Sequence, residues 1–142
     1  MENLEEYCRS IELPELYIKR VKKIVSLFEK IFPEPVEEIF ITNELDSEDI
    51  HRFENLWLFS KNYCGEAKKF ISIEEMEILN LKEISCINIK SREYEFGSEP
   101  TMYSKLNVTC SFNNGMKFLL SGSRENCKKI YEIYLKYFKP NL

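Results

Sequence analysis

Histidine is the commonest general base in enzymes that activate a serine or cysteine, and this chain contains one histidine, His51. It closes the string DSEDIH, the most charged stretch of the chain, which we expect to be a loop. The same string offers Asp46, Glu48 and Asp49 as oxygen ligands for a divalent cation, but it lacks the glycine and the spacing of an EF-hand loop. The sequence therefore predicts no catalytic residue, no metal site and no cofactor, and we expect that the chain is not an enzyme.

The five cysteines show neither the CxxC spacing of redox motifs nor the paired spacing of zinc sites. They are Cys8, Cys64, Cys86, Cys110 and Cys127. An odd number of cysteines, in a chain whose first residues form neither a basic start nor a long apolar run, indicates free thiols and a cytoplasmic protein. Cys110 and Cys127 fall in apolar stripes, so we predict that both are buried and unreactive.

Adjacent like charges occur at several other places, where they are typical of solvated surfaces. The acidic pairs Glu37-Glu38 and Glu74-Glu75 would point to opposite faces of a strand, so they rarely converge on one substrate. The basic pairs Lys22-Lys23, Lys68-Lys69 and Lys128-Lys129 fall on three different predicted elements. Because nucleic-acid binders gather such residues with aromatic side chains on one face, we expect no nucleic-acid binding.

The acidic residues are concentrated in one stretch. Residues 33–54 hold eight acids and one base, a local net charge of −7, whereas the rest of the chain carries +3 within a total of −4. One interpretation is a charged sheet edge that prevents aggregation. The other is an acidic docking surface for a basic protein partner, with Glu44, Asp46, Glu48 and Asp49 as the candidate binding residues.

Hydrophobic periodicity predicts helices at both ends of the chain. The segment 14–32 has apolar residues at three- and four-residue steps, Pro14 suits its first turn, and Pro33 ends it. Its predicted buried face comprises Tyr17, Val21, Ile24, Phe28, Ile31 and Phe32. A shorter helix is expected over 2–10. Ser123 is expected to cap the C-terminal helix. The buried face of that helix is predicted to comprise Cys127, Ile130, Tyr131, Tyr134 and Phe138.

Between these helices the apolar period changes to the alternation of β-strands. Strand candidates are 36–45, 54–62, 63–72 and 83–96, the last with a bend or bulge near Lys90-Ser91. The clearest hairpin alternates apolar residues from Leu106 to Leu120 around Asn114-Gly115, which is typical of a type I′ turn. The predicted fold class is α+β, with an N-terminal helix, six to seven antiparallel strands and a C-terminal amphipathic helix.

This order of elements resembles the pleckstrin-homology (PH) superfold, in particular its bacterial PH-like and GRAM-like branches. The segments that carry the resemblance are LWLFS at 56–60, ILNLKEISCINI at 78–89, and the hairpin and helix of 106–138. The resemblance covers residues 36–138 and implies a PH-like barrel or sandwich closed by the C-terminal helix. Residues 1–35 would then be a helical addition, and 1–142 a single domain.

Two features depart from the PH pattern. Many PH domains carry a tryptophan in the closing helix, whereas the single tryptophan here is Trp57, so we expect Tyr131 or Tyr134 to take its place. Phosphoinositide-binding members have a basic loop between the first two strands, whereas residues 44–54 are acidic here. Because that charge repels inositol phosphates, we expect no phosphoinositide binding by the basic-loop route.

The resemblance and the charge pattern together predict a non-catalytic PH-like module that acts in protein interaction or regulation, with a toxin-neutralising immunity protein as a special case. The Lys-, Ile- and Asn-rich composition fits a bacterium with an AT-rich genome. The alternative is a small-molecule-binding domain with an apolar pocket between the N-terminal helix and the sheet, lined by Phe28 and Phe32. The sequence leaves the oligomeric state open, including whether that helix covers its own sheet or a neighbour's.

Overall fold

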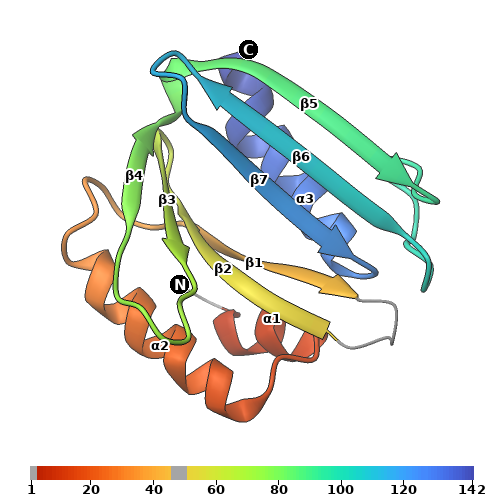
Figure 1. The fold of residues 1–142 in the computed structure, drawn as a ribbon, viewed down its shortest axis with the longest axis horizontal. Coiled ribbons are helices and arrows are strands. Elements are labelled where there is room, and N and C mark those ends of the chain that lie inside the picture. Colours follow the sequence, from red (N-terminus) through yellow and green to blue (C-terminus); the bar gives the residue numbers. More distant parts are fainter. Residues whose placement is uncertain (1–2, 46–50) are drawn as a thin grey trace.

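The computed structural model describes residues 3–45 and 51–142 of the chain (Figure 1). Three helices and seven strands make up most of this part. The helices are α1 (Leu4–Ser10), α2 (Glu15–Glu29) and α3 (Asn126–Ile133). The strands are β1 (Glu38–Leu45), β2 (His51–Phe59), β3 (Tyr63–Lys68), β4 (Glu77–Asn80), β5 (Ile84–Arg92), β6 (Lys105–Phe112) and β7 (Lys117–Ser123). Within the described residues, no helix is both long and apolar enough to cross a membrane.

The described strands confirm the α+β class but form two separate antiparallel sheets, ordered β1-β2-β3-β4 and β5-β6-β7, in place of the closed PH-like barrel implied by the resemblance. A short 3₁₀ turn, Leu81–Glu83, leads from the first sheet into the second. At the other side β1 and β7 approach each other, and there the Asn43 side chain accepts a hydrogen bond from the Ser123 backbone N–H at 3.0 Å. A side-chain hydrogen bond thus connects the two sheets at the place where backbone hydrogen bonds between β1 and β7 would be needed to close a barrel.

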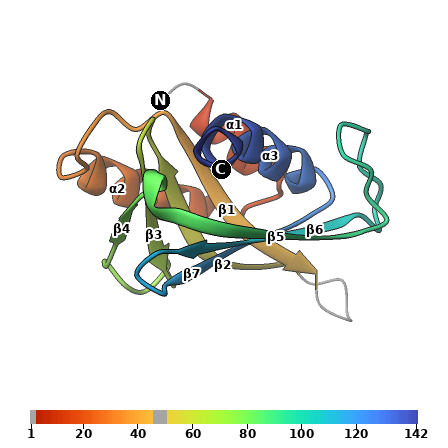
Figure 2. The same ribbon diagram turned by 90° about the horizontal axis from the view of Figure 1, so that it is seen from above.

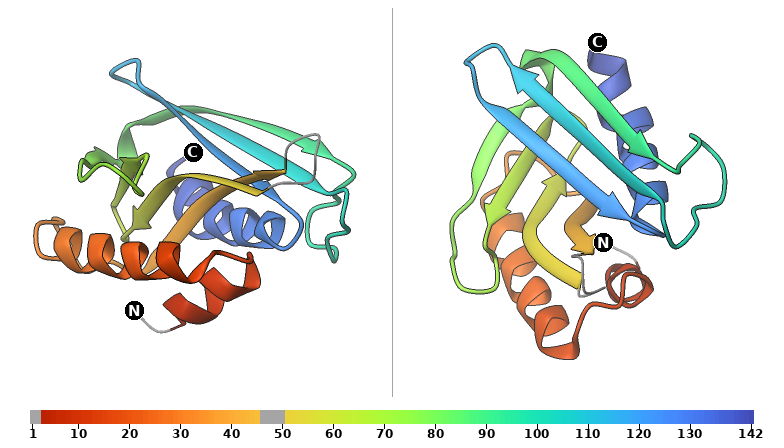
Figure 3. Two further views of the ribbon diagram at one scale, coloured as in Figure 1. Left: turned by 60° about the horizontal axis from the view of Figure 1, so that its bottom comes forward. Right: turned by 45° about the vertical axis from the view of Figure 1, so that its right-hand side comes forward.

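The two N-terminal helices cover one face of the first sheet (Figure 3). Helix α2 begins after Pro14, as the sequence predicts, and its buried residues pack against Ile39, Leu56 and Leu58. Phe28 and Phe32, which the small-molecule alternative placed around a pocket, are buried in this core. Ile31 departs from the predicted buried face and is 62% exposed, because the helix has ended at Glu29.

Aromatic contacts join the two sheets to each other and to the closing helix. Trp57 of β2 meets Phe118 of β7 with ring centroids 4.9 Å apart, and Phe59 stacks on Tyr137 at 5.2 Å. Neither Tyr131 nor Tyr134 is fully buried, contrary to the prediction. After Ile133 the chain continues with a wider π-helical turn, Tyr134–Phe138, which shifts the helical phase and brings Tyr137 into the core.

Several local predictions are corrected. Asn114 does not adopt the positive φ of a type I′ turn; only Gly115 does, at 87°, as in a three-residue loop with a G1 bulge. Ser123 ends β7 and is buried, so it does not cap α3. The irregularity of β5 lies between Ile84 and Cys86 and not near Lys90-Ser91. Strand β4 was not predicted.

A buried polar cluster holds α1, α3 and β1 together. Asn126, the first residue of α3, is fully buried and donates to the Ile41 carbonyl at 2.7 Å and to Asn43 Oδ1 at 2.9 Å. The side-chain oxygen Oδ1 of Asn126 accepts a hydrogen bond from the Tyr7 hydroxyl at 2.8 Å, and that hydroxyl accepts one from the Ile41 backbone N–H. Every member has a partner, so this cluster serves to fix the helices on the sheet.

Candidate functional site

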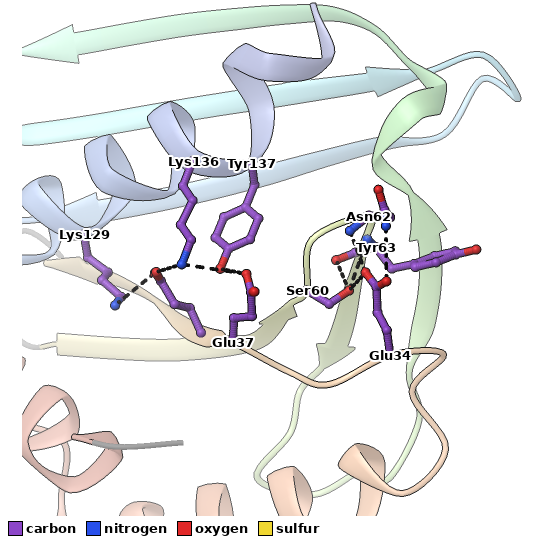
Figure 4. A network of polar contacts seen from close by, with 9 residues as sticks. Glu34, Glu37, Ser60, Asn62, Tyr63, Lys129, Lys136 and Tyr137 are labelled. Atoms are coloured by element: carbon purple, nitrogen blue, oxygen red, sulfur yellow. Dashed lines mark hydrogen bonds and ion pairs between the residues drawn. The ribbon is translucent and has the colours of Figure 1, made fainter.

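Some carboxylates of the acidic stretch 33–54 form hydrogen bonds and ion pairs within the protein (Figure 4). Glu34 accepts hydrogen bonds from the Ser60 hydroxyl at 2.5 Å and the Asn62 backbone N–H at 2.6 Å, and the hydroxyl bond lowers the pKa of Glu34 below its usual value. Glu37 accepts from the Tyr137 hydroxyl at 3.0 Å. Both carboxylates thus already accept hydrogen bonds within the protein, although Glu37 is also exposed to solvent.

Glu38 belongs to the same network and is shared by two lysines of the closing helix. Its carboxylate oxygens lie 3.4 Å from Lys129 Nζ and 3.2 Å from Lys136 Nζ. The acidic pair Glu37-Glu38 is therefore partly paired with the protein's own cations, and not the fully solvated surface that the sequence predicted.

The described acids that remain lie at the opposite end of β1 and β2, beside a cleft between the sheets. We call it the intersheet cleft; it is a cavity of about 240 Å³ between β1, β2 and β3 on one side and the edge strand β7 on the other. Its lining comprises Thr42, Glu44, Glu54, Asn55, Glu66, Lys68, Lys117, Phe118, Leu119 and Ser121. Glu44 Oε1 accepts from the Ser121 hydroxyl at 2.7 Å, whereas Glu54 is exposed and its side chain forms no hydrogen bond or ion pair with another described residue.

Glu66 is the buried carboxyl group of the intersheet cleft and is only 4% exposed. Its Oε2 accepts a hydrogen bond from the Asn55 side chain at 3.0 Å, but Oε1 is buried with no hydrogen-bond partner among the described residues. Lys68 Nζ lies 3.9 Å from Oε1, which is an ion-pair distance beyond hydrogen-bond reach. Burial raises the pKa of Glu66 to about 7, against the opposing effect of Lys68 and with a smaller contribution from Glu77.

Strand register explains why this carboxyl faces the cleft. Glu66 lies directly opposite Trp57 in the β2–β3 pair, and Trp57 points toward the second sheet. Directly opposed residues lie on the same face of a sheet, so the Glu66 side chain must point toward β7 as well. A single charged residue in an otherwise buried strand segment, Cys64–Ala67, was the sequence signal that could have identified it.

Thr42 contributes a second unpartnered polar atom to the intersheet cleft. It lies at the irregularity in the β1–β2 pairing, between Ile41 and Asn43, where the register shifts by one residue. Thr42 is 7% exposed, and its Oγ1 is buried without a hydrogen-bond partner among the described residues. A buried hydroxyl and a buried carboxylate oxygen that both lack a partner are costly for folding, which makes the pair a candidate for contact with a ligand.

A larger cavity, of about 350 Å³, lies beside α1 and the start of α3 and includes Asn43, Thr101 and Arg124 in its lining. Asn43 is already bonded to Ser123 and Asn126, whereas Arg124 Nε is buried without a hydrogen-bond partner among the described residues. This cavity therefore has one unpartnered buried polar atom in its described lining, against two in the intersheet cleft.

Of the candidate residues predicted from sequence, Glu44 lies in the intersheet cleft, and Asp46, Glu48 and Asp49 lie outside the described residues, as does the side chain of His51. Sequence reasoning missed Thr42 and Glu66.

The predicted burial of two cysteines is confirmed, since Cys110 is 1% and Cys127 0% exposed. Burial raises the pKa of both thiols to about 12, which keeps them protonated and unreactive. Within residues 3–45 and 51–142, no group of three or more His, Cys, Asp or Glu side chains is placed to hold a metal ion. No family model matches the chain, and neither a curated protein nor a solved structure shows significant similarity to it.

Proposed function

We propose that this protein is a non-catalytic, PH-like interaction module that binds a basic protein partner, and that a lysine or arginine side chain of the partner enters the intersheet cleft. The observation that carries the proposal is the buried Glu66 carboxyl, whose Oε1 has no hydrogen-bond donor among the described residues. An ammonium or guanidinium group would supply that donor.

The surroundings of Glu66 favour a cationic group over a neutral or anionic one. Glu44 and Glu54 add two carboxylates at the cleft, and the Thr42 hydroxyl can accept a further hydrogen bond. Lys68 and Lys117 line the cleft too, but both are exposed and can turn into solvent when a further cation enters. A cation in this position would also favour the ionised form of Glu66 and lower its pKa.

The proposal also includes the acidic residues that follow β1 in the sequence. Asp46, Glu48 and Asp49 come directly after β1, one end of which contributes Glu44 to the cleft. A basic partner anchored in the cleft would be steered by these charges, which act mainly on the association rate and are screened by salt.

A direct test measures the binding of a fluorescent oligolysine peptide by anisotropy. Glu66→Gln keeps the size of the side chain but removes its charge, and we expect it to weaken binding about tenfold, since a charged hydrogen bond contributes about 1.5–3 kcal/mol. Replacing Asp46, Glu48 and Asp49 together by Asn should weaken binding mainly through a slower association rate.

The matched control replaces three exposed acids elsewhere, Glu29, Glu75 and Glu132, by Gln, which alters the total charge without touching the cleft. A loss in this control as large as that of the Asp46, Glu48 and Asp49 variant, and larger than that of Glu66→Gln, would show that the peptide responds to net charge alone. That result would overturn the proposed role of the cleft.

A further inference from the structure

The second sheet leaves one broad face uncovered. Helix α3 packs on the side of the sheet that carries Val108, Leu120 and Gly122, as the close approach of Ile130 to Gly122 shows. Figure 2 shows α3 along one side of β5 and β6 with no helix on the other, and Figure 1 looks onto that other side. We call it the open face; it is formed by the alternate residues of β5, β6 and β7 that point away from the core.

Apart from Leu119, the open face carries basic and neutral polar side chains and no acid. Its cations are Lys90, Arg92, Lys105 and Lys117. Ser121 and Ser123 belong to the same face but are buried where β7 approaches β1. In sequence these cations are separated from one another, so no adjacent basic pair indicated the cluster. Strand register brings them together.

Three of the cations form a triangle at one end of the open face. Arg92 lies directly opposite Lys105 across the β5–β6 pair, which places their Cβ atoms about 5 Å apart. Lys90 lies two residues before Arg92 on the same face, at about 7 Å. All three are exposed, and none forms an ion pair with another described residue.

This arrangement has an energetic cost for the free protein. Like charges directly opposite each other on a sheet are destabilising, and no carboxylate of the described chain forms an ion pair with Arg92 or Lys105. Elsewhere in the described part some cations are paired, as Lys129 and Lys136 are with Glu38, and no other two cations lie directly opposite each other in a strand pair. An unpaired basic triangle beside a row of neutral hydrogen-bond donors, including Asn88, is complementary to a row of anionic groups.

We infer that the open face binds an extended acidic segment of a protein partner that runs along β5, with Asp or Glu side chains at alternate positions opposite Lys90 and Arg92. An extended chain presents alternate side chains about 7 Å apart, which is the spacing of Lys90 and Arg92. Lys105, directly opposite Arg92, would contact the same carboxylate as Arg92.

Two observations favour an acidic peptide over a nucleic acid. The side chains of the open face contain no aromatic ring on which a base could stack. The face is also bounded at β7 by the carboxylate of Glu44, which accepts a hydrogen bond from Ser121. A long phosphate backbone would cross that acidic border, whereas a short acidic segment fits within the three strands.

The experiment compares fluorescent peptides by anisotropy. The probe is a short peptide in which Glu alternates with Ser, and the matched peptide has Gln at each Glu position. We expect the wild-type protein to bind only the Glu peptide, with an affinity that falls as salt is added. The triple variant K90Q/R92Q/K105Q should bind about tenfold more weakly, because three exposed ion pairs at about 0.5 kcal/mol each are lost.

The control variant K19Q/K30Q/K139Q removes the same charge from exposed lysines on α2, after α2 and after α3, and should retain wild-type affinity within about twofold. Thermal unfolding of both variants establishes that they are folded. Equal binding of the Glu and Gln peptides, or equal losses in the two triple variants, would overturn the inference.

A duplex DNA or RNA of similar length serves as the competing probe. Tighter binding of the duplex than of the Glu peptide, lost in K90Q/R92Q/K105Q, would also overturn the inference and assign the open face to nucleic acid. The variant Glu66→Gln separates this inference from the proposed function, because it changes the intersheet cleft and should leave Glu-peptide binding unchanged.

Discussion

The first sheet has helices on one face and the second sheet on the other, so nearly all of its central strands are buried, including Leu56, Trp57, Leu58 and Phe59. The second sheet has only one covered face. On its open face the strand residues are polar or basic, and Leu119 is 44% exposed. The chain thus uses one sheet as the centre of its core and the other as a wall with a free surface.

The difference matters most where the two sheets meet. At the edge of β7 the second sheet no longer covers the first. There the intersheet cleft is lined by the buried carboxyl group of Glu66, which lies on the same face of the first sheet as Trp57. The acidic cleft and the basic open face share Lys117, Leu119 and Ser121 of β7. Two surfaces of opposite charge therefore adjoin along one strand, which suits a module that docks partners through charge complementarity.

The largest effect on stability is expected from the face shared by the sheets. Trp57→Ala removes a fully buried ring that contacts Phe118, and it should lower the free energy of unfolding by about 3–5 kcal/mol. Leu119→Ala on the open face is the matched control and should cost less than about 0.5 kcal/mol. Urea denaturation of both variants measures the difference; similar losses would contradict the distinction between a core sheet and a free surface.

A smaller effect is expected at the polar junction between α3 and β1. Asn126→Ala leaves the Ile41 carbonyl and the Tyr7 hydroxyl without their buried partner, so we expect a loss of about 3 kcal/mol. Chemical denaturation gives the value. A loss below about 0.5 kcal/mol would show that water replaces the missing amide, and that the junction does not fix the helix on the sheet.

The sequence predicts some elements of this fold and not others. Helix α2 and the β6–β7 hairpin were predicted because their apolar periods are local and strong. The division into two sheets, the burial of Tyr137 by a π turn and the position of strand β4 were not, since each depends on packing between distant segments.

For the candidate sites too, the sequence predicts local features but not those that depend on the pairing of distant segments. The acidic stretch was evident from composition, and Glu44 of that stretch lines the intersheet cleft. The buried Glu66 and the triangle of Lys90, Arg92 and Lys105 required strand register, which a single sequence does not give. Composition indicated which stretch is charged, and strand pairing determined which charged side chains lie together.

The cleft should also make stability depend on pH. The pKa of Glu66 is raised to about 7 from an ordinary 4.5, so the folded state holds a proton that the unfolded state releases between these values. By linkage, this carboxyl lowers stability as pH rises from about 4.5 through 7. Glu66→Gln should remove that loss and be more stable than wild type above pH 7 by about 3 kcal/mol, since the pKa values of about 7 and 4.5 differ by about 2.5 and one pKa unit corresponds to about 1.4 kcal/mol.

Thermal unfolding of wild type and Glu66→Gln across this pH range checks the prediction. The stabilities should converge near pH 4.5 and diverge toward pH 8. A constant difference between the two proteins would mean that Glu66 does not titrate in this range.

The smallest effect is expected on the open face. Arg92→Gln removes one of two like charges that lie directly opposite each other, so it should raise stability by about 0.2–0.5 kcal/mol at low salt. Added salt should abolish the gain because it screens exposed charges. Calorimetric unfolding at two salt concentrations gives the comparison, and a destabilised variant would show that Arg92 has a structural role.

The account depends most on Glu66 as a buried acid that a cation can reach, and carbon-detected NMR of its side-chain carboxyl measures this directly. In the free protein the carboxyl signal should titrate with a pKa near 7. Saturating oligolysine peptide should lower that pKa, because the bound ammonium group stabilises the carboxylate. A pKa at the ordinary value of 4.5, or one that the peptide leaves unchanged, would contradict the proposed binding cleft.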